Sequence, residues 1–189
     1  LSSIMKKHPQ NEEAKNIYQD PPLEQLRSVL NLYTHGKLQK ALSESSQMLE
    51  RFPNSVVLYN ISGVSNAGLM QFDAAIDSYK QALKIKPDYV DAYNNMGATL
   101  HDKGDLEAAI DSYKQAIKIQ PDFDGAYNNM GMTLIELGQR DNAFLNLKKC
   151  HELIRGNDPV NPFHKSFLTI SQAKIEHDIE QFKYLADSG

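Results

Sequence analysis

The chain has 189 residues, which is enough for one ordinary domain or for a short array of repeats. Apolar residues make up 41% of it and charged residues 23%, so a buried core is expected. The formal net charge is −4 and no basic stripe is visible, which argues against nucleic-acid partners, because these need clustered Lys and Arg to neutralise phosphates.

Residues 1–21 are polar with a weak helical pattern and are expected to form an N-terminal extension. They lack the apolar stretch of a signal peptide, and no run in the chain approaches the roughly 20 apolar residues of a membrane span. The single cysteine, Cys150, excludes an intrachain disulfide, which fits a reducing compartment. We therefore expect a cytoplasmic protein, and the lack of an apolar span predicts no membrane contact. The first residue is Leu1 and not Met, which favours a fragment or a processed product of a longer protein.

From residue 22 onward a block recurs every 34 positions. Residues 73–89 and 107–123 are identical at thirteen of seventeen positions, and the decapeptides 91–100 and 125–134 repeat at the same interval. A fixed period of this length predicts stacked units that bury their apolar faces against one another, and it argues against a single core around one active site.

Residues 90–123 show the pattern within one unit. Apolar and small residues at helical spacing predict a first helix through Tyr93, Gly97 and Leu100 and a second helix through Ala109 and Tyr113. The recurring small residues are expected where the two helices cross closely, and the large tyrosines are expected to fill the gaps.

The residues between the helices predict how each helix ends. Gly104 is expected to close the first helix in the left-handed conformation, and Asp105 is expected to accept the free amides of the second. Pro121 should end the second helix, and Asp122 is expected to cap the next unit.

The pattern Tyr93-x-x-x-Gly97-x-x-Leu100, followed by Ala109-x-x-x-Tyr113-x-x-Ala116 and Pro121, resembles the tetratricopeptide repeat (TPR) family. The resemblance implies an all-α fold, a right-handed superhelical solenoid of antiparallel helix hairpins. It covers residues 22–157 as four units, which are 22–55, 56–89, 90–123 and 124–157.

The first unit, 22–55, is degenerate. It carries Gln25, Ser28 and Val29 where the family pattern has an aromatic residue, an apolar residue and glycine. Terminal units of solenoids often depart in this way, because their outer faces meet solvent.

Residues 158–189 begin with two prolines and continue as a predicted helix over 163–186, expected to be a C-terminal capping helix that packs on the fourth unit. A second interpretation is that part of its wide apolar arc faces a partner, a second copy or a following domain. The segment is loosely similar to helical connectors that join TPR arrays to transferase or oxygenase domains in bacterial multidomain proteins.

The resemblance implies that the first helices of the units line a concave groove where an extended peptide binds. The predicted groove positions are Asn60, Val64, Asp91, Asn94, Asn95, Ala98, His101, Asn128, Asn129, Met132 and Ile135.

Asn95 and Asn129 share the position of the asparagine ladder in the TPR region of O-linked N-acetylglucosamine transferase. A carboxamide has one acceptor and two donors and can pair with a peptide backbone in both directions, although the same residues could instead bridge neighbouring repeats. No Lys or Arg occupies a groove position, which argues against a carboxylate clamp for acidic tails. With Asp91, Asp102 and Glu136 present, the sequence predicts a partner segment with apolar or basic side chains.

No constellation of reactive groups is found. His151-Glu152 begins like a zinc-protease motif, but Arg155 stands where the second histidine is needed, and the six histidines lack metal-ligand spacing. Cys150 occupies a packing position, which favours a small buried residue over a nucleophile. The sequence therefore predicts no catalytic residue, cofactor or metal.

These observations predict a non-catalytic protein-interaction scaffold. Two alternatives stay open: a TPR module of a larger enzyme, such as a transferase or an oxygenase, and a structural homo-oligomer that associates through its terminal helices.

Overall fold

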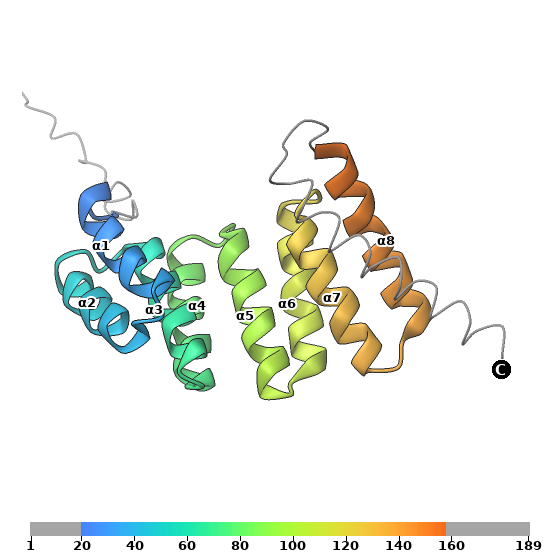
Figure 1. Cartoon of the computed structure of the whole chain (residues 1–189), viewed down its shortest axis with the longest axis horizontal. Helices are drawn as coiled ribbons and strands as arrows, with labels where there is room; N and C mark the ends of the chain where they lie inside the picture. Colours follow the sequence, from blue (N-terminus) through green and yellow to red (C-terminus); the bar gives the residue numbers. More distant parts are fainter. Residues whose placement is uncertain (1–19, 158–189) are drawn as a thin grey trace, which may run out of the picture.

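The computed structural model describes residues 20–157, and these residues form eight α-helices and no strand. The helices follow one another in chain order along the long axis of the molecule (Figure 1). Their bounds are α1 Leu23–Thr34, α2 Leu38–Arg51, α3 Val56–Gly68, α4 Phe72–Ile85, α5 Val90–Lys103, α6 Leu106–Ile119, α7 Asp124–Glu136 and α8 Arg140–Asn157.

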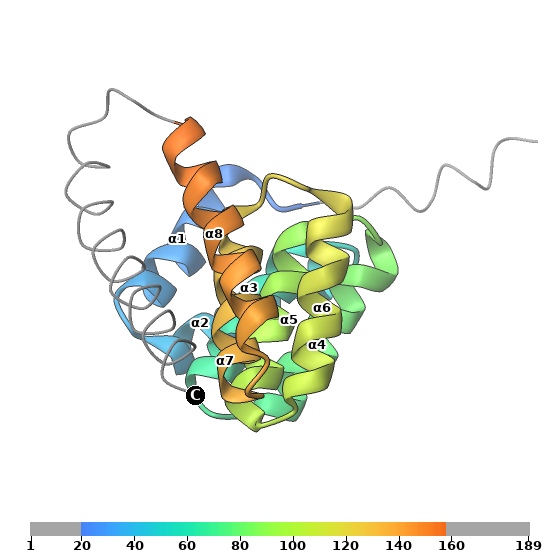
Figure 2. The ribbon, with the colours of Figure 1, turned by 90° about the vertical axis from the view of Figure 1, so that its right-hand side faces the viewer.

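Consecutive helices pair as four hairpins, α1–α2, α3–α4, α5–α6 and α7–α8, and each hairpin packs on the next (Figure 1, Figure 2). The second helix of each hairpin contacts the first helix of the following one, and the first helices also contact one another directly. This arrangement confirms an all-α solenoid of antiparallel helix hairpins. The predicted capping helix over 163–186 and almost all of the N-terminal extension lie outside the described residues, and the exact unit boundaries stay a prediction.

Each hairpin turn places one residue in the left-handed region. Three turns use glycine, with φ values of 70° at Gly36, 92° at Gly104 and 71° at Gly138, so the prediction for Gly104 is confirmed. The turn between α3 and α4 instead holds Met70 at φ 60°, with 75% of the residue exposed. An L-residue other than Asn or Asp is strained in this conformation, because Cβ approaches the following carbonyl oxygen.

The predicted caps are only partly right. Asp105 is the residue before α6, but its carboxylate makes no hydrogen bond to the helix amides and lies 3.5 Å from Lys103 Nζ instead. Asp122 does not cap α7, because the residue before that helix is Phe123. A nearby lysine therefore competes with the helix amides for the Asp105 carboxylate.

A close crossing of the two helices recurs in the hairpins. A Cβ added at Gly63 would lie 2.3 Å from the Tyr79 ring, and one at Gly97 would lie 2.5 Å from the Tyr113 ring. Both tyrosines are 1% exposed, so glycine is required where the ring packs against the backbone of the first helix.

In the first hairpin the small and the large residue of this crossing are interchanged between the two helices. Val29 stands 34 residues before Gly63 and Ser45 stands 34 residues before Tyr79, and both are fully buried. Because the second helix offers a small side chain here, the first helix can carry a Cβ and two methyl groups. The departure of Val29 from the repeat pattern is thus compensated inside the same hairpin.

The buried tyrosines also reach the next hairpin. The Tyr79 hydroxyl lies beside Thr99 on α5, and Thr99 Oγ1 donates a hydrogen bond to the Asn95 carbonyl oxygen over 2.9 Å. Tyr113 and Thr133 repeat the arrangement one unit later, and burial raises the pKa of Tyr113 to about 12. Each phenol therefore stays neutral and joins two hairpins.

The same link is absent between the first and second hairpins. Ser45, in the place of Tyr79, pairs instead with Ser62 Oγ over 2.9 Å. Ser65, in the place of Thr99, is fully buried, and its Oγ has no hydrogen-bond partner among residues 20–157. The polar contact is lost here because a serine side chain is too short to span the distance that a tyrosine covers.

Gly97→Val should lower the free energy of unfolding by about 1–3 kcal/mol, because the added carbons overlap the Tyr113 ring. In the Tyr113→Ser background the same change should cost less, because it rebuilds the pairing of Val29 and Ser45. Urea denaturation of the four chains of this double-mutant cycle measures the coupling. An equal cost of the valine in both backgrounds would contradict the size-exchange explanation.

Met70→Gly should raise the free energy of unfolding by roughly 0.5–1 kcal/mol, because relief of the left-handed strain exceeds the entropy that glycine adds to the unfolded chain. The matched control is Gly104→Met, which copies the second turn into the third and should destabilise. Thermal and urea unfolding of both variants give the two signs, and a shift in the same direction for both would show that the turns are not equivalent.

Candidate functional site

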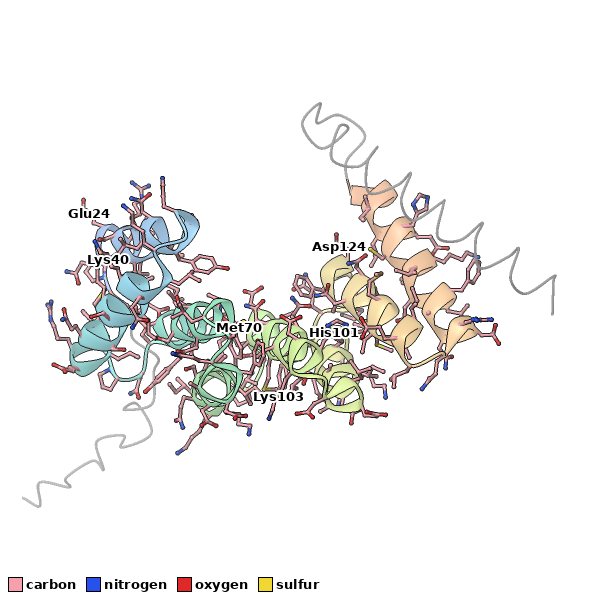
Figure 3. All side chains as sticks on the ribbon, turned by 60° about the horizontal axis from the view of Figure 1, so that its bottom comes forward. Glu24, Lys40, Met70, His101, Lys103 and Asp124 are labelled. Atoms are coloured by element: carbon pink, nitrogen blue, oxygen red, sulfur yellow. The ribbon has the colours of Figure 1, made fainter. Side chains whose placement is uncertain are left out.

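The candidate binding surface is the solvent-facing side of α3, α5 and α7, which we call the first-helix face. These helices contact one another in series, so their side chains form one continuous surface. The hairpins follow an arc, and the labelled His101 and Asp124 lie on its inner side (Figure 3). All eleven predicted groove positions are partly or fully exposed, and none of them belongs to the buried core.

Asparagines join the first helices laterally. Asn95 Nδ2 donates to Asn60 Oδ1 over 3.1 Å, and Asn129 Nδ2 donates to Asn94 Oδ1 over 3.0 Å. Of the two roles that the sequence leaves open, the structure thus shows the bridge between neighbouring repeats. Each bridge uses one donor of one carboxamide and one acceptor of the other, so further donors stay on every member.

The next pair on this face is His101 of α5 with Glu136 of α7. His101 Nε2 lies 2.9 Å from Glu136 Oε1, and His101 Nδ1 lies 3.5 Å from Asp102 Oδ1. The imidazole is held between two carboxylates and is only 24% exposed, so its position is fixed before any ligand arrives.

Sequence reasoning left a bridge between neighbouring repeats open for the asparagines, but it did not identify which side chains pair, and it did not pair His101 with Glu136. The signal that could have found it is a spacing of 35 residues, one more than the repeat, which separates the members of both asparagine pairs and of the His101–Glu136 pair. The hydrogen bond of 2.6 Å from Ser55 Oγ to Asp20 Oδ1 also has this spacing. Side chains on adjacent first helices meet at this offset because the helices are staggered by about one residue.

The charge of the first-helix face is acidic. Asp91, Asp102 and Glu136 are exposed and Asp124 is half-buried, whereas none of the eleven positions carries a lysine or an arginine. Apolar side chains lie among these groups, including Met132, of which 38% is exposed. The surface therefore offers hydrogen-bonding amides, negative charge and small apolar patches in one strip.

The candidate nucleophile is inert. Cys150 is 2% exposed, and burial, with a smaller contribution from Asp124, raises the pKa of its thiol to about 11. A thiol with this pKa is protonated at neutral pH and is a poor nucleophile.

Within residues 20–157 no group of three or more His, Cys, Asp or Glu side chains could hold a metal ion. No helix in that range is both long and apolar enough to cross a bilayer.

The fold and this surface define a helical repeat scaffold. The sequence profile of the TPR repeat matches residues 71–104 and 99–138, and that of the tetratricopeptide repeat matches residues 124–157. Residues 71–157 of the chain are therefore tetratricopeptide repeats. No curated protein matches its sequence significantly.

Solved structures of MamA share this fold. One crystal structure of MamA is 27% identical, with a TM-score of 0.65 over 70% of this chain and 77% of that one. A second is 25% identical, with a TM-score of 0.65 over 79% of this chain and 82% of that one. MamA from Desulfovibrio magneticus, beginning at residue 41, is 20% identical with a TM-score of 0.65 over 77% and 80% of the two chains, which shows the fold alone.

Proposed function

We propose that this protein is a non-catalytic scaffold that binds an extended partner segment with apolar or basic side chains on the first-helix face. Tetratricopeptide repeats mediate protein interaction in general. The observation that supports this more specific proposal is the composition of the first-helix face. Exposed carboxylates and amides lie beside apolar side chains there, and no cationic side chain occupies the predicted positions.

The rigidity of the face supports the proposal. The asparagine bridges and the His101–Glu136 contact fix polar side chains on neighbouring first helices. Binding to groups that are already ordered costs less side-chain entropy than binding to mobile ones. The amide donors that remain can pair with backbone carbonyl groups of a partner, which gives affinity with little sequence preference.

The negative charge of the first-helix face supports a preference for basic over acidic partner segments. Asp91 and Asp102 are exposed acids on α5, at its two ends. A basic side chain gains from such charges, whereas an acidic one is repelled and finds no lysine or arginine at the predicted positions to hold it. A partner with an acidic terminal tail therefore fits this surface poorly.

The test uses two synthetic peptides of equal length, one alternating Leu with Lys and the other Leu with Glu, titrated at low salt by fluorescence anisotropy. We expect the Lys peptide to bind more tightly. Asp91→Asn with Asp102→Asn should weaken it by about two- to fivefold for each charge removed, the range of exposed ion pairs. The matched control, Asp77→Asn with Glu50→Gln on the second helices, should leave the affinity unchanged.

Equal affinity for the two peptides would contradict the proposal, as would an equal loss in the control variant. Repeating the titration at high salt provides a second check, because binding that depends on exposed charges must weaken as screening increases.

A further inference from the structure

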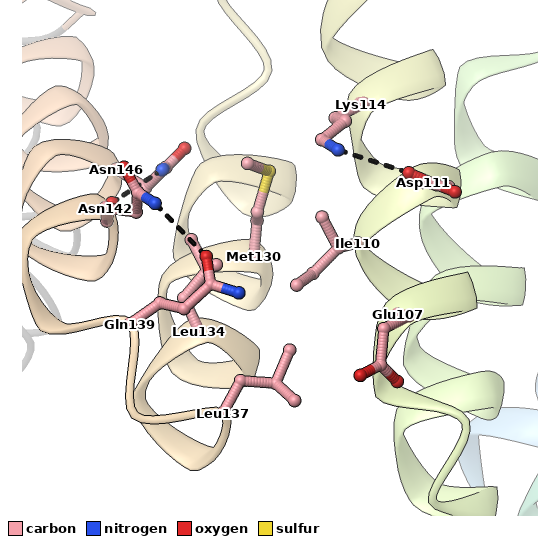
Figure 4. A pocket seen from close by; sticks show the side chains of 10 residues that line it. All are labelled: Glu107, Ile110, Asp111, Lys114, Met130, Leu134, Leu137, Gln139, Asn142 and Asn146. Carbon is pink, nitrogen blue, oxygen red and sulfur yellow. Dashed lines mark hydrogen bonds and ion pairs between the residues drawn. The ribbon is translucent and has the colours of Figure 1, made fainter.

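A hollow lies between α6 and α8, the second helices of the last two described hairpins (Figure 4). We call this cavity of about 500 Å³ the α6–α8 groove. Its floor is apolar and consists of Ile110 of α6 with Met130, Leu134 and Leu137 from α7 and the turn that follows it. Ile110 and Leu134 are 7% and 3% exposed, so the floor belongs to the core.

This groove is separate from the first-helix face. Its α7 residues include 130 and 134, whereas the first-helix face is centred on positions 128 and 132 of the same helix and also includes 129 and 135. Residues two apart on an α-helix point about 200° away from each other. The two surfaces therefore lie on opposite sides of α7, and a ligand at one does not touch the other.

The two walls of the groove are polar and differ in charge. The α6 wall carries Glu107 and Asp111, and Asp111 is paired with Lys114 over 3.2 Å. The α8 wall is uncharged and includes Gln139 and Asn142, whose side chains are joined by a hydrogen bond of 3.1 Å (Figure 4). Glu107 has no cationic side chain within 4.0 Å in the described range of the chain.

The repeat supplies an internal comparison, because the same place exists 34 residues earlier between α4 and α6. Its floor positions are occupied by the same residue types, Ile76, Met96 and Leu100. At that joint a lysine from the end of α5 links the two walls. Lys103 Nζ lies 2.8 Å from Asp73 Oδ1 on α4 and 3.5 Å from Asp105 Oδ2 at the start of α6.

At the α6–α8 groove the acid is kept but the lysine is lost. Glu107 stands in the place of Asp73, whereas Leu137 replaces Lys103 and Gln139 replaces Asp105. The groove therefore presents a carboxylate where the earlier joint binds an ammonium group, and an additional apolar side chain where the earlier joint has the aliphatic stem of lysine.

We propose that the α6–α8 groove binds a lysine-bearing apolar segment of a partner protein. The partner's ammonium group pairs with the Glu107 carboxylate and with the side-chain oxygen Oε1 of Gln139. This is the position that Lys103 Nζ holds at the earlier joint. Aliphatic side chains next to that lysine cover Leu137 and Leu134. A volume of about 500 Å³ accommodates a few side chains but not a folded element.

The probe for the test is the synthetic peptide Gly-Ser-Leu-Leu-Lys-Leu-Ser-Gly, titrated to millimolar concentration into the full ¹⁵N-labelled chain. Backbone amide shifts locate the binding, and we expect them at residues 107, 134, 137 and 139. A matched peptide with Gln in place of Lys should bind about two- to fivefold more weakly, as expected for one exposed ion pair. Glu107→Gln should produce the same loss for the Lys peptide and no loss for the Gln peptide.

The decisive variant copies the earlier joint into the later one. Leu137→Lys with Gln139→Asp supplies an internal ammonium group to Glu107 and should abolish the shifts in the groove while the fold is retained. The matched control, Asp73→Asn, acts on the earlier joint only and should leave peptide binding at the groove unchanged.

Three results would overturn the proposal: equal binding of the Lys and Gln peptides, unchanged binding by the Leu137→Lys, Gln139→Asp chain, or no shift at the groove in the full chain. The last result would mean that the groove does not bind such a segment or that another occupant, such as residues 158–189 of this chain or a second copy, already covers it. Shifts confined to residues 128 and 132 would place the peptide on the first-helix face, so the failures of the two proposals are distinguishable.

Discussion

The buried tyrosine of each central hairpin is the contact on which the stack depends. Tyr79 and Tyr113 pack against a glycine of their own first helix and lie beside a threonine of the next hairpin. One side chain therefore sets the crossing distance within a unit and the position of the unit that follows. The lateral asparagine bridges depend on this placement, because they join first helices that the tyrosines hold in register.

Sequence periodicity was sufficient to predict the helices, the hairpins and the glycines of the crossings. These features follow from single positions that recur at a fixed interval, such as Gly97 and Gly104, whose physical requirements are local. The peptide contacts of the first-helix face stay predictions.

The pairings between positions could not be predicted in the same way. Val29 fits at the helix crossing of the first hairpin because the facing residue, Ser45, is small. Asp105 does not cap α6 because its carboxylate lies near Lys103. Both require knowledge of which side chains on different helices meet. The offset of 35 residues between bridging partners is visible in the sequence only after the stagger of adjacent first helices is known.

The two candidate surfaces show how a repeat array gains distinct binding properties from few changes. The first-helix face is built on positions where asparagine recurs in successive units, at 60, 94 and 128 and at 95 and 129, so it is suited to an extended segment along several units. The α6–α8 groove instead arises where one unit departs from its neighbour, at Leu137 and Gln139. Recurrence produces a long and tolerant surface, and local departure produces a confined one.

Native-state hydrogen exchange of wild type and Tyr113→Leu tests the central role of the tyrosine most directly. Leucine occupies this position in the last hairpin, as Leu147, so the variant can pack on Gly97 while losing the contact between the tyrosine hydroxyl and Thr133. We predict faster amide exchange in α7, the first helix of the next hairpin, as well as in α6. Faster exchange confined to α6, with α7 protected as in wild type, would contradict the account.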